Sequence, residues 1–139
     1  MNETDLLLEK GERSLRAAER LLADGDTDFA ASRIYYAYFY TAQALLATRG
    51  IDLSRHGQVI AQYGLHFSKT RALDPTFHNW FSTAFKLRQL ADYQVEVSVE
   101  PEEVDNLISG CRRFIAAAAE YLDQFQGESS DPEEPVKPE

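Results

Sequence analysis

Residues 33–47 read RIYYAYFYTAQALLA, a segment that is apolar or aromatic almost throughout. At about 100° per residue, a helix formed by this segment has two distinct faces. One face suits a core and carries Tyr35, Tyr38, Phe39, Ala42, Leu45 and Leu46. The other face carries Arg33, Tyr36, Ala37, Tyr40, Ala44 and Ala47. A buried hydroxyl without a partner costs roughly 1–3 kcal/mol. The four tyrosines therefore indicate a buried helix with a polar contact, which is either a binding site or a subunit interface.

The rest of the chain is typical of helices separated by short breaks. The helical spacing of apolar residues predicts helices over about 4–23, 27–49, 56–63, 75–93 and 101–125. We expect Thr27 to cap the second of these helices, because its hydroxyl suits an N-cap. The sequence therefore predicts an all-α fold: an up-and-down helical bundle of four long helices plus a short helix.

Composition changes near the C-terminal end of the sequence. Gly, Ser, Pro and Glu dominate residues 126–139, and apolar residues are nearly absent. This change predicts one helical domain over residues 1–125, followed by an acidic, Pro-rich disordered tail.

Several features favour a cytoplasmic protein. No run approaches the ~20 apolar residues that a membrane span needs, and the acidic first residues do not resemble a signal peptide. The single cysteine, Cys111, excludes an internal disulfide and fits a reducing compartment. Cys111 also falls on the apolar stripe of the last predicted helix, which favours a core position.

Charge is distributed unevenly along the chain. The net charge is −9, which argues against non-specific nucleic-acid binding by the whole surface. Residues 27–95, however, hold seven Lys/Arg against four Asp/Glu, together with all three histidines. This middle region is suited to meet an anion, unless its charges are merely scattered over solvated faces.

Two arginines are candidates for an anion site. Arg88 and Asp92 lie one turn apart on the predicted helix 75–93. Asp92 is in the last turn, where the helix dipole disfavours an anion, so Arg88 is its expected partner. The pair is either a structural salt bridge or part of a site in which the planar guanidinium binds phosphate. Arg33 also needs a partner, and pairing with an acid such as Asp92 would join both arginines in one cluster.

Motifs for metal or cofactor binding are not found in the sequence. His56, His66 and His78 lack the spacing of metal ligands, and no Gly-rich phosphate loop or nucleophile elbow occurs. We expect neither a metal nor a cofactor.

The chain carries a series of motifs in residues 32–39, 42–46, 56–60, 66–70, 84–88 and 91–93, with Gly50 between the second and third segments. Together they resemble one known family, the HEPN domains, in its small stand-alone bacterial and archaeal branch. The resemblance covers about residues 5–125. It implies a helical bundle that commonly forms a homodimer, and a minimal nucleotidyltransferase as the partner in a toxin–antitoxin pair.

The resemblance also implies a nuclease motif that this sequence does not complete. HEPN ribonucleases carry an arginine followed, after four to six residues, by a histidine, and both act on RNA between protomers. The arginine corresponds to Arg88, but the histidine positions hold Tyr93, Gln94 and Val95. A phenol, with a pKa near 10, is a weak base at neutral pH.

Three functional hypotheses follow, and the sequence leaves open whether the protein is an enzyme. The first is a dimeric binding module that presents a polar cluster to a nucleotide, to RNA or to the transferase: Arg33, Tyr36, Tyr40, Arg88, Asp92 and Tyr93. The alternative is a metal-independent endoribonuclease toxin with a degenerate motif, in which Arg88 stabilises charge and His56 or His66 is the base. In the third, the cluster only sets the register of a structural dimer.

Overall fold

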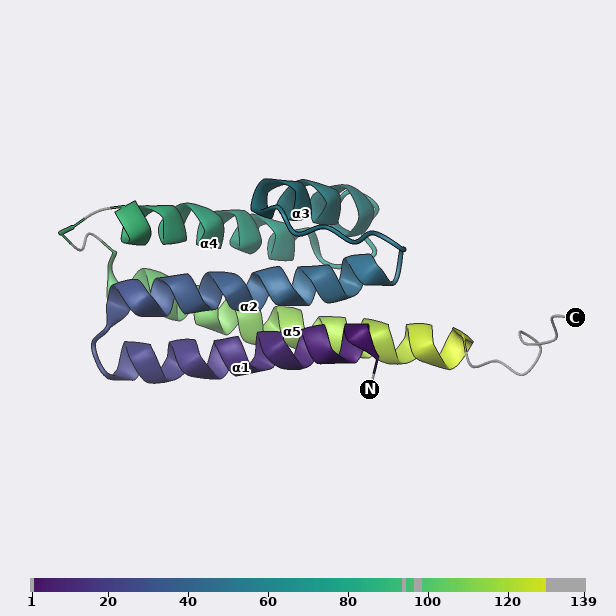
Figure 1. Cartoon of the computed structure of the whole chain (residues 1–139), viewed down its shortest axis with the longest axis horizontal. Helices are drawn as coiled ribbons and strands as arrows, with labels where there is room; N and C mark the ends of the chain where they lie inside the picture. Colours follow the sequence, from purple (N-terminus) through teal and green to yellow (C-terminus); the bar gives the residue numbers. More distant parts are fainter. Residues whose placement is uncertain (1, 94, 97–98, 130–139) are drawn as a thin grey trace, which may run out of the picture.

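The computed structural model describes residues 2–93, 95–96 and 99–129, and all regular elements in these ranges are helical. The elements are α1 (Glu3–Ala23), α2 (Thr27–Ala47), α3 (His56–Tyr63), the π-helix η1 (Gly64–Ser68), α4 (Pro75–Tyr93) and α5 (Pro101–Ser129). The long helices α1, α2, α4 and α5 alternate in direction along the bundle (Figure 1). The predicted all-α bundle of four long helices plus a short helix is therefore confirmed. None of the described helices is both long enough and apolar enough to cross a membrane.

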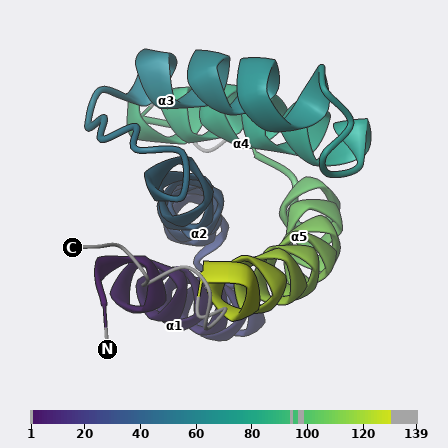
Figure 2. The same cartoon turned by 90° about the vertical axis from the view of Figure 1, so that its right-hand side faces the viewer.

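Helix α2 occupies the centre of the bundle. Seen end-on, it lies between α1 and the layer formed by α3 and α4, and α5 lies on a third side (Figure 2). This position explains its composition, because a helix packed against others on three sides buries apolar residues on most of its surface. Ala37 and Ala44, which the sequence placed on the polar face, are fully buried. The half-buried residues of that face include Arg33, Tyr36 and Tyr40.

The contact between α2 and α5 is built around a buried tyrosine. The Tyr38 hydroxyl donates to the carbonyl oxygen of Leu107 over 2.7 Å, and its ring stacks on Phe81 and Phe114 with centroids 6.2 and 5.7 Å away. Gly110 makes this packing possible, because a Cβ there would lie 2.8 Å from the Tyr38 hydroxyl and 2.5 Å from the Trp80 ring.

Two helix ends differ from the sequence prediction. Asp26, not Thr27, is the N-cap residue of α2, and Thr27 is the first residue of the helix. Helix α5 does not end near residue 125 but continues to Ser129. Residues 126–129, which the sequence analysis placed in the predicted tail, are therefore helical, and residues 130–139 lie outside the described residues.

The π-helix η1 was not predicted. It continues directly from α3, and Gly64 is its first residue. A Cβ on Gly64 would come within 2.5 Å of His78 Nε2. The chain can therefore follow this path beside α4 because residue 64 lacks a side chain.

Candidate functional site

Arg88 projects from α4 onto the tyrosines of α2. Its side chain is 15% exposed, and its Cζ atom lies 5.1 Å from the ring centroid of Tyr35 and 5.7 Å from that of Tyr36. Its Nη1 donates a hydrogen bond to the Tyr36 hydroxyl over 3.0 Å. Aromatic faces attract a guanidinium, which stays charged at any physiological pH. The fold therefore holds a mostly buried cation between α2 and α4.

The predicted pairing of Arg88 with Asp92 is confirmed. Arg88 Nε lies 3.4 Å from Asp92 Oδ2. The contact is an ion pair but not an aligned hydrogen bond, and this buried Nε has no hydrogen-bond partner among the described residues. Buried donors without partners are rare and costly. Among the described residues, the guanidinium therefore donates through Nη1 to Tyr36, while its Nε faces Asp92 without an aligned hydrogen bond.

His56, the first residue of α3, completes the site from a third helix. Its Nδ1 atom shares a hydrogen bond of 2.6 Å with the Tyr35 hydroxyl, and its ring stacks on Phe39 with centroids 4.7 Å apart. Burial lowers the pKa of His56, and the positive charge of Arg88 lowers it further. Both effects favour the uncharged ring, so His56 is neutral near pH 7. Burial raises the pKa of Tyr35, which therefore remains protonated.

These side chains form one group, which we call the arginine cluster: Tyr35, Tyr36, His56, Arg88 and Asp92. Tyr35 is the member that the sequence analysis missed, because helical periodicity placed it on the core face. It is indeed fully buried, yet its hydroxyl bonds to a titratable ring. The available signal was the residue type, since a buried tyrosine needs a partner that phenylalanine does not need.

Arg33 and Tyr40 lie next to the arginine cluster, on the side of α1. The Arg33 Cζ atom is 4.8 Å from the Tyr36 ring centroid, and Lys10 Nζ is 4.7 Å from that of Tyr40. The rings of Tyr36 and Tyr40 are 5.8 Å apart. Among the described residues Arg33 makes no ion pair, so the expected pair with Asp92 is not formed.

Two other predicted site residues lie apart from Arg88. Tyr93 is 80% exposed, and no hydrogen bond or ring contact joins it to Arg88 within the described ranges. His66 belongs to η1, where its carbonyl accepts a hydrogen bond from Thr70, and no contact in the described part of the chain links it to Arg88. Of the two candidate bases, the structure brings only His56 to Arg88.

A comparison of the sequence with known families matches residues 4–122 to the HEPN domain. The chain belongs to the HEPN domain family. The matched range contains the whole arginine cluster, so the cluster is part of the HEPN domain itself.

Relatives of this HEPN domain occur in archaea and bacteria. "Putative toxin MJ0142" of Methanocaldococcus jannaschii is 37% identical over 120 residues, which cover 86% of this chain and 82% of the relative. A "UPF0332 protein" of Thermotoga maritima is 30% identical over 130 residues, covering 91% and 98%. A second M. jannaschii protein, "Putative toxin MJ0605", is 31% identical over 113 residues, covering 81% and 84%.

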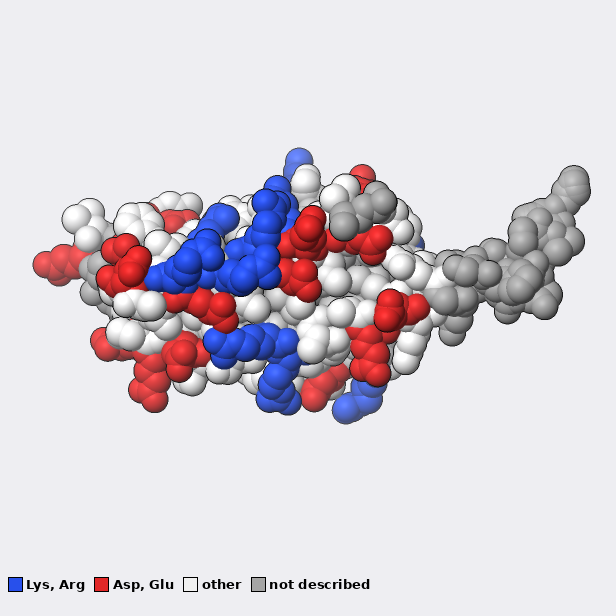
Figure 3. Space-filling view, turned by 90° about the horizontal axis from the view of Figure 1, so that it is seen from below, with Lys and Arg blue, Asp and Glu red and all other residues white. Residues whose placement is uncertain are grey.

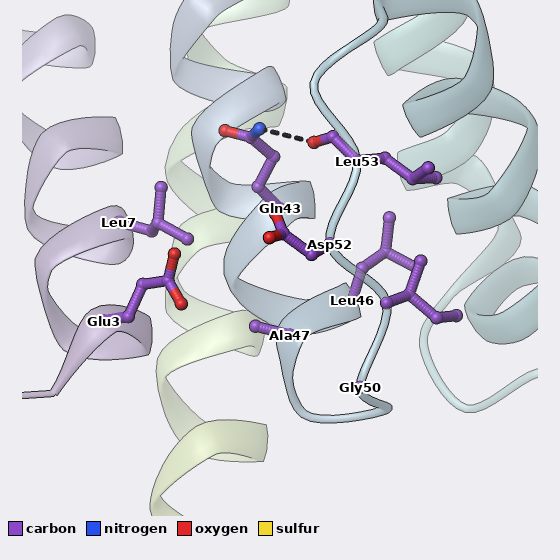
Figure 4. Close-up of a pocket in the computed structure, with 9 residues that line it drawn as sticks. Glu3, Leu7, Gln43, Leu46, Ala47, Gly50, Asp52 and Leu53 are labelled. Carbon is purple, nitrogen blue, oxygen red and sulfur yellow. Dashed lines mark hydrogen bonds between the residues drawn. The ribbon is translucent and has the colours of Figure 1, made fainter.

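The HEPN domain also has a hollow away from the arginine cluster (Figure 4). It lies between the start of α1, the end of α2 and the following loop, and Gln43 Nε2 crosses it to donate to the Leu53 carbonyl over 2.8 Å. The carboxylates of Glu3 and Asp52 lie beside it. None of its lining residues belongs to the arginine cluster, so this hollow has no part in the candidate site.

Proposed function

We propose that this HEPN protein is a toxin-type, dimeric binding module that holds a nucleotide or RNA through the arginine cluster. In this proposal its partner is a minimal nucleotidyltransferase, and both proteins form a toxin–antitoxin pair. Membership of the HEPN family supports the proposal, as does the naming of two relatives as toxins.

The state of Arg88 is the observation that carries the proposal. A buried guanidinium whose Nε makes no hydrogen bond to any described residue is suited to bind a phosphate, because charge-assisted hydrogen bonds from arginine to phosphate are strong and often bidentate. Asp92, whose side chain is 43% exposed, is free to turn toward water when a phosphate replaces it. The half-buried rings of Tyr36 and Tyr40 offer a surface on which a base can stack.

Binding to single-stranded RNA and to ATP tests the proposal. We expect Arg88→Gln to weaken binding about tenfold or more, measured by fluorescence anisotropy for RNA and by calorimetry for ATP. Lys86→Gln is the matched control, because Lys86 is an exposed cation on the same helix and lies outside the cluster. Equal losses in both variants would show that Arg88 is not a specific ligand.

The partner and the toxin role need separate tests. We expect the wild-type protein to arrest bacterial growth when expressed alone, and the Arg88→Gln variant to arrest it less. A nucleotidyltransferase encoded next to this protein should copurify with it and relieve the arrest. Light scattering should give twice the monomer mass; a monomer would remove the dimer from the proposal.

The position of His56 favours a second function, that of a metal-independent ribonuclease. A neutral imidazole beside Arg88 provides a base next to a group that stabilises negative charge. For Nε2 to accept a proton, Nδ1 must carry its own proton and donate it to the Tyr35 oxygen. In this arrangement Tyr35 positions the base.

Cleavage of RNA in the presence of EDTA tests the second function. Arg88→Ala and His56→Ala should each abolish cleavage, whereas His66→Ala should retain it. Because the pKa of His56 is lowered, the rate should persist to a lower pH than an ordinary histidine base allows. Cleavage that is unaffected by His56→Ala would exclude this mechanism.

A further inference from the structure

A shallow cavity between α1 and α2 is lined by cations. Its volume is ≈ 220 Å³, and its lining residues are Lys10, Arg13, Ser14, Ala17 and Arg33. Ser14 is 5% exposed, which leaves a hydroxyl group beside three positive side chains. We call this feature the cationic cavity.

Within the part of the chain that the structure describes, the three cations of the cationic cavity have no acidic partners. Among the described residues Lys10, Arg13 and Arg33 make no ion pair, although Glu9 lies one turn before Arg13. Lys10 and Arg33 instead lie over the rings of Tyr40 and Tyr36. The face of the molecule that carries α1 shows a gathering of Lys and Arg side chains near its middle, with carboxylates on either side (Figure 3). Like charges that converge on one hollow repel one another, and an anion would relieve this repulsion.

The cationic cavity and Arg88 lie on opposite sides of the α2 tyrosines. Helix α1 packs on one side of α2 and α4 on the other (Figures 1 and 2). Arg33 from the cavity and Arg88 from the cluster both approach the Tyr36 ring, at 4.8 and 5.7 Å from its centroid. Two positive sites are thus separated by a platform of half-buried aromatic rings.

We infer that the cationic cavity is a second phosphate subsite, and that a single RNA strand crosses α2 from this cavity to Arg88. This inference rests on the proposed function in its RNA form. In a nucleic-acid strand, successive phosphates are separated by a nucleoside whose base can stack on an aromatic ring. In a nucleoside polyphosphate the phosphates are adjacent, so they do not need two sites on either side of a ring. The arrangement therefore fits a strand better than a mononucleotide.

Two double variants of the full chain test the subsite. Lys10→Gln/Arg13→Gln removes two charges from the cavity, and Arg16→Gln/Arg20→Gln removes two charges from α1 outside it. Affinity for a labelled single-stranded RNA is measured by anisotropy over a range of KCl concentrations. We expect the cavity variant to bind about tenfold more weakly, and its salt slope to fall by about 0.7 for each phosphate that the protein no longer neutralises. The control variant should stay within about twofold of wild type.

The outcomes separate this inference from the proposed function. If Arg88→Gln loses RNA binding while the cavity variant equals its control, the arginine cluster binds RNA and the second subsite is wrong. If wild type binds no RNA, the RNA form of the proposed function is wrong. Pyrophosphate titration followed by NMR then decides: shifts at the amides of Ser14 and Ala17 would support an anion site, and their absence would overturn it. Circular dichroism confirms that each variant is folded.

Discussion

The two sides of α2 use tyrosine in different ways. Toward α5, Tyr38 donates to a backbone carbonyl and is enclosed by Phe81 and Phe114. Toward α3 and α4, the hydroxyls of Tyr35 and Tyr36 bond to His56 and Arg88. On the first side, the tyrosine hydroxyl bonds to a backbone carbonyl, which cannot change its charge. On the second side, the tyrosine hydroxyls bond to a titratable ring and to a cation whose Nε makes no hydrogen bond within the described ranges.

This difference shows how one helix can belong both to the core and to the candidate site. A backbone carbonyl is fixed by its helix, so the Tyr38 contact holds α2 and α5 in a single arrangement. Burial also raises the pKa of Tyr38, which keeps its hydroxyl protonated as a donor. The contacts of Tyr35 and Tyr36 are made to side chains, which have more freedom to rearrange than a backbone carbonyl. Substitutions should therefore affect stability on one side and binding on the other.

The largest expected effect comes from the ring that both sides share. Phe81 is fully buried, and its ring centroid is 6.0 Å from Tyr35 and 6.2 Å from Tyr38. Phe81→Ala should lower the free energy of unfolding by about 3–5 kcal/mol, because it leaves a cavity under both tyrosines. Urea denaturation measures the change. Leu65→Ala, at a side chain that is 48% exposed, should change it by less than about 0.5 kcal/mol.

The next effect concerns the α5 side alone. Gly110→Ala places a Cβ against Trp80 and the Tyr38 hydroxyl, which should cost about 1–3 kcal/mol of stability. RNA affinity should be unchanged, since the arginine cluster does not contact Gly110. Gly57→Ala is the control: no heavy atom lies within 4 Å of its added Cβ, and helix propensity should raise stability by up to about 1 kcal/mol. The midpoint of thermal unfolding is measured for both variants. A decrease in Gly110→Ala alone shows that close packing at residue 110, and not alanine in general, lowers the stability.

Removing one hydroxyl from each side compares the sides directly. Tyr38→Phe should lower stability by roughly 0.5–1.5 kcal/mol and leave RNA affinity unchanged. Tyr36→Phe should lower stability less, because Tyr36 is only half-buried, but weaken RNA binding several-fold, since Arg88 loses the acceptor that orients it. Denaturation and anisotropy are measured on the same samples. If Tyr38→Phe lost as much RNA affinity as Tyr36→Phe, the proposed division of α2 into a stability side and a binding side would be wrong.

The smallest effect is the pH dependence that His56 contributes. Its pKa is lowered in the fold, so the unfolded chain binds more protons below the ordinary value of about 6.5. The free energy of unfolding should therefore decrease as pH drops from 7 through the pKa of His56 in the folded protein. The His56→Gln variant should lack the contribution of His56 to this decrease. NMR titration of the imidazole measures the pKa itself. Arg88→Gln should move it up, toward 6.5, because the neighbouring positive charge is gone.

Local sequence patterns were sufficient to predict most of the helices and one contact of the candidate site. The helix 75–93 has the predicted bounds, since Pro75 suits a first helical position. The pair of Arg88 and Asp92 followed from their spacing of one turn and from the helix dipole. Both inferences concern residues within a single helix, where geometry is fixed by sequence separation.

Contacts between helices were not predictable in the same way. His56 rather than His66 lies near Arg88 because of the path by which the loop after α2 leads into α3. No pattern within the sequence of the loop or of α3 specifies that path. Gln43 contributes to it by holding the Leu53 carbonyl. Helical periodicity places Tyr35 in the core because it indicates burial, but it does not indicate which group the buried hydroxyl bonds to. The π-helix at Gly64 depends on the space taken by His78.

The position of His56 as the first residue of α3 has one more electrostatic consequence. Its N-cap, Arg55, makes no side-chain cap, and the first N–H groups of a helix carry a partial positive charge. The macrodipole of α3 therefore disfavours an imidazolium at this position, independently of burial and of Arg88. A phosphate bound to Arg88 would offset the charge of the guanidinium, but it would leave the dipole in place. The start of α3 would thus help to keep His56 uncharged with the proposed phosphate in place.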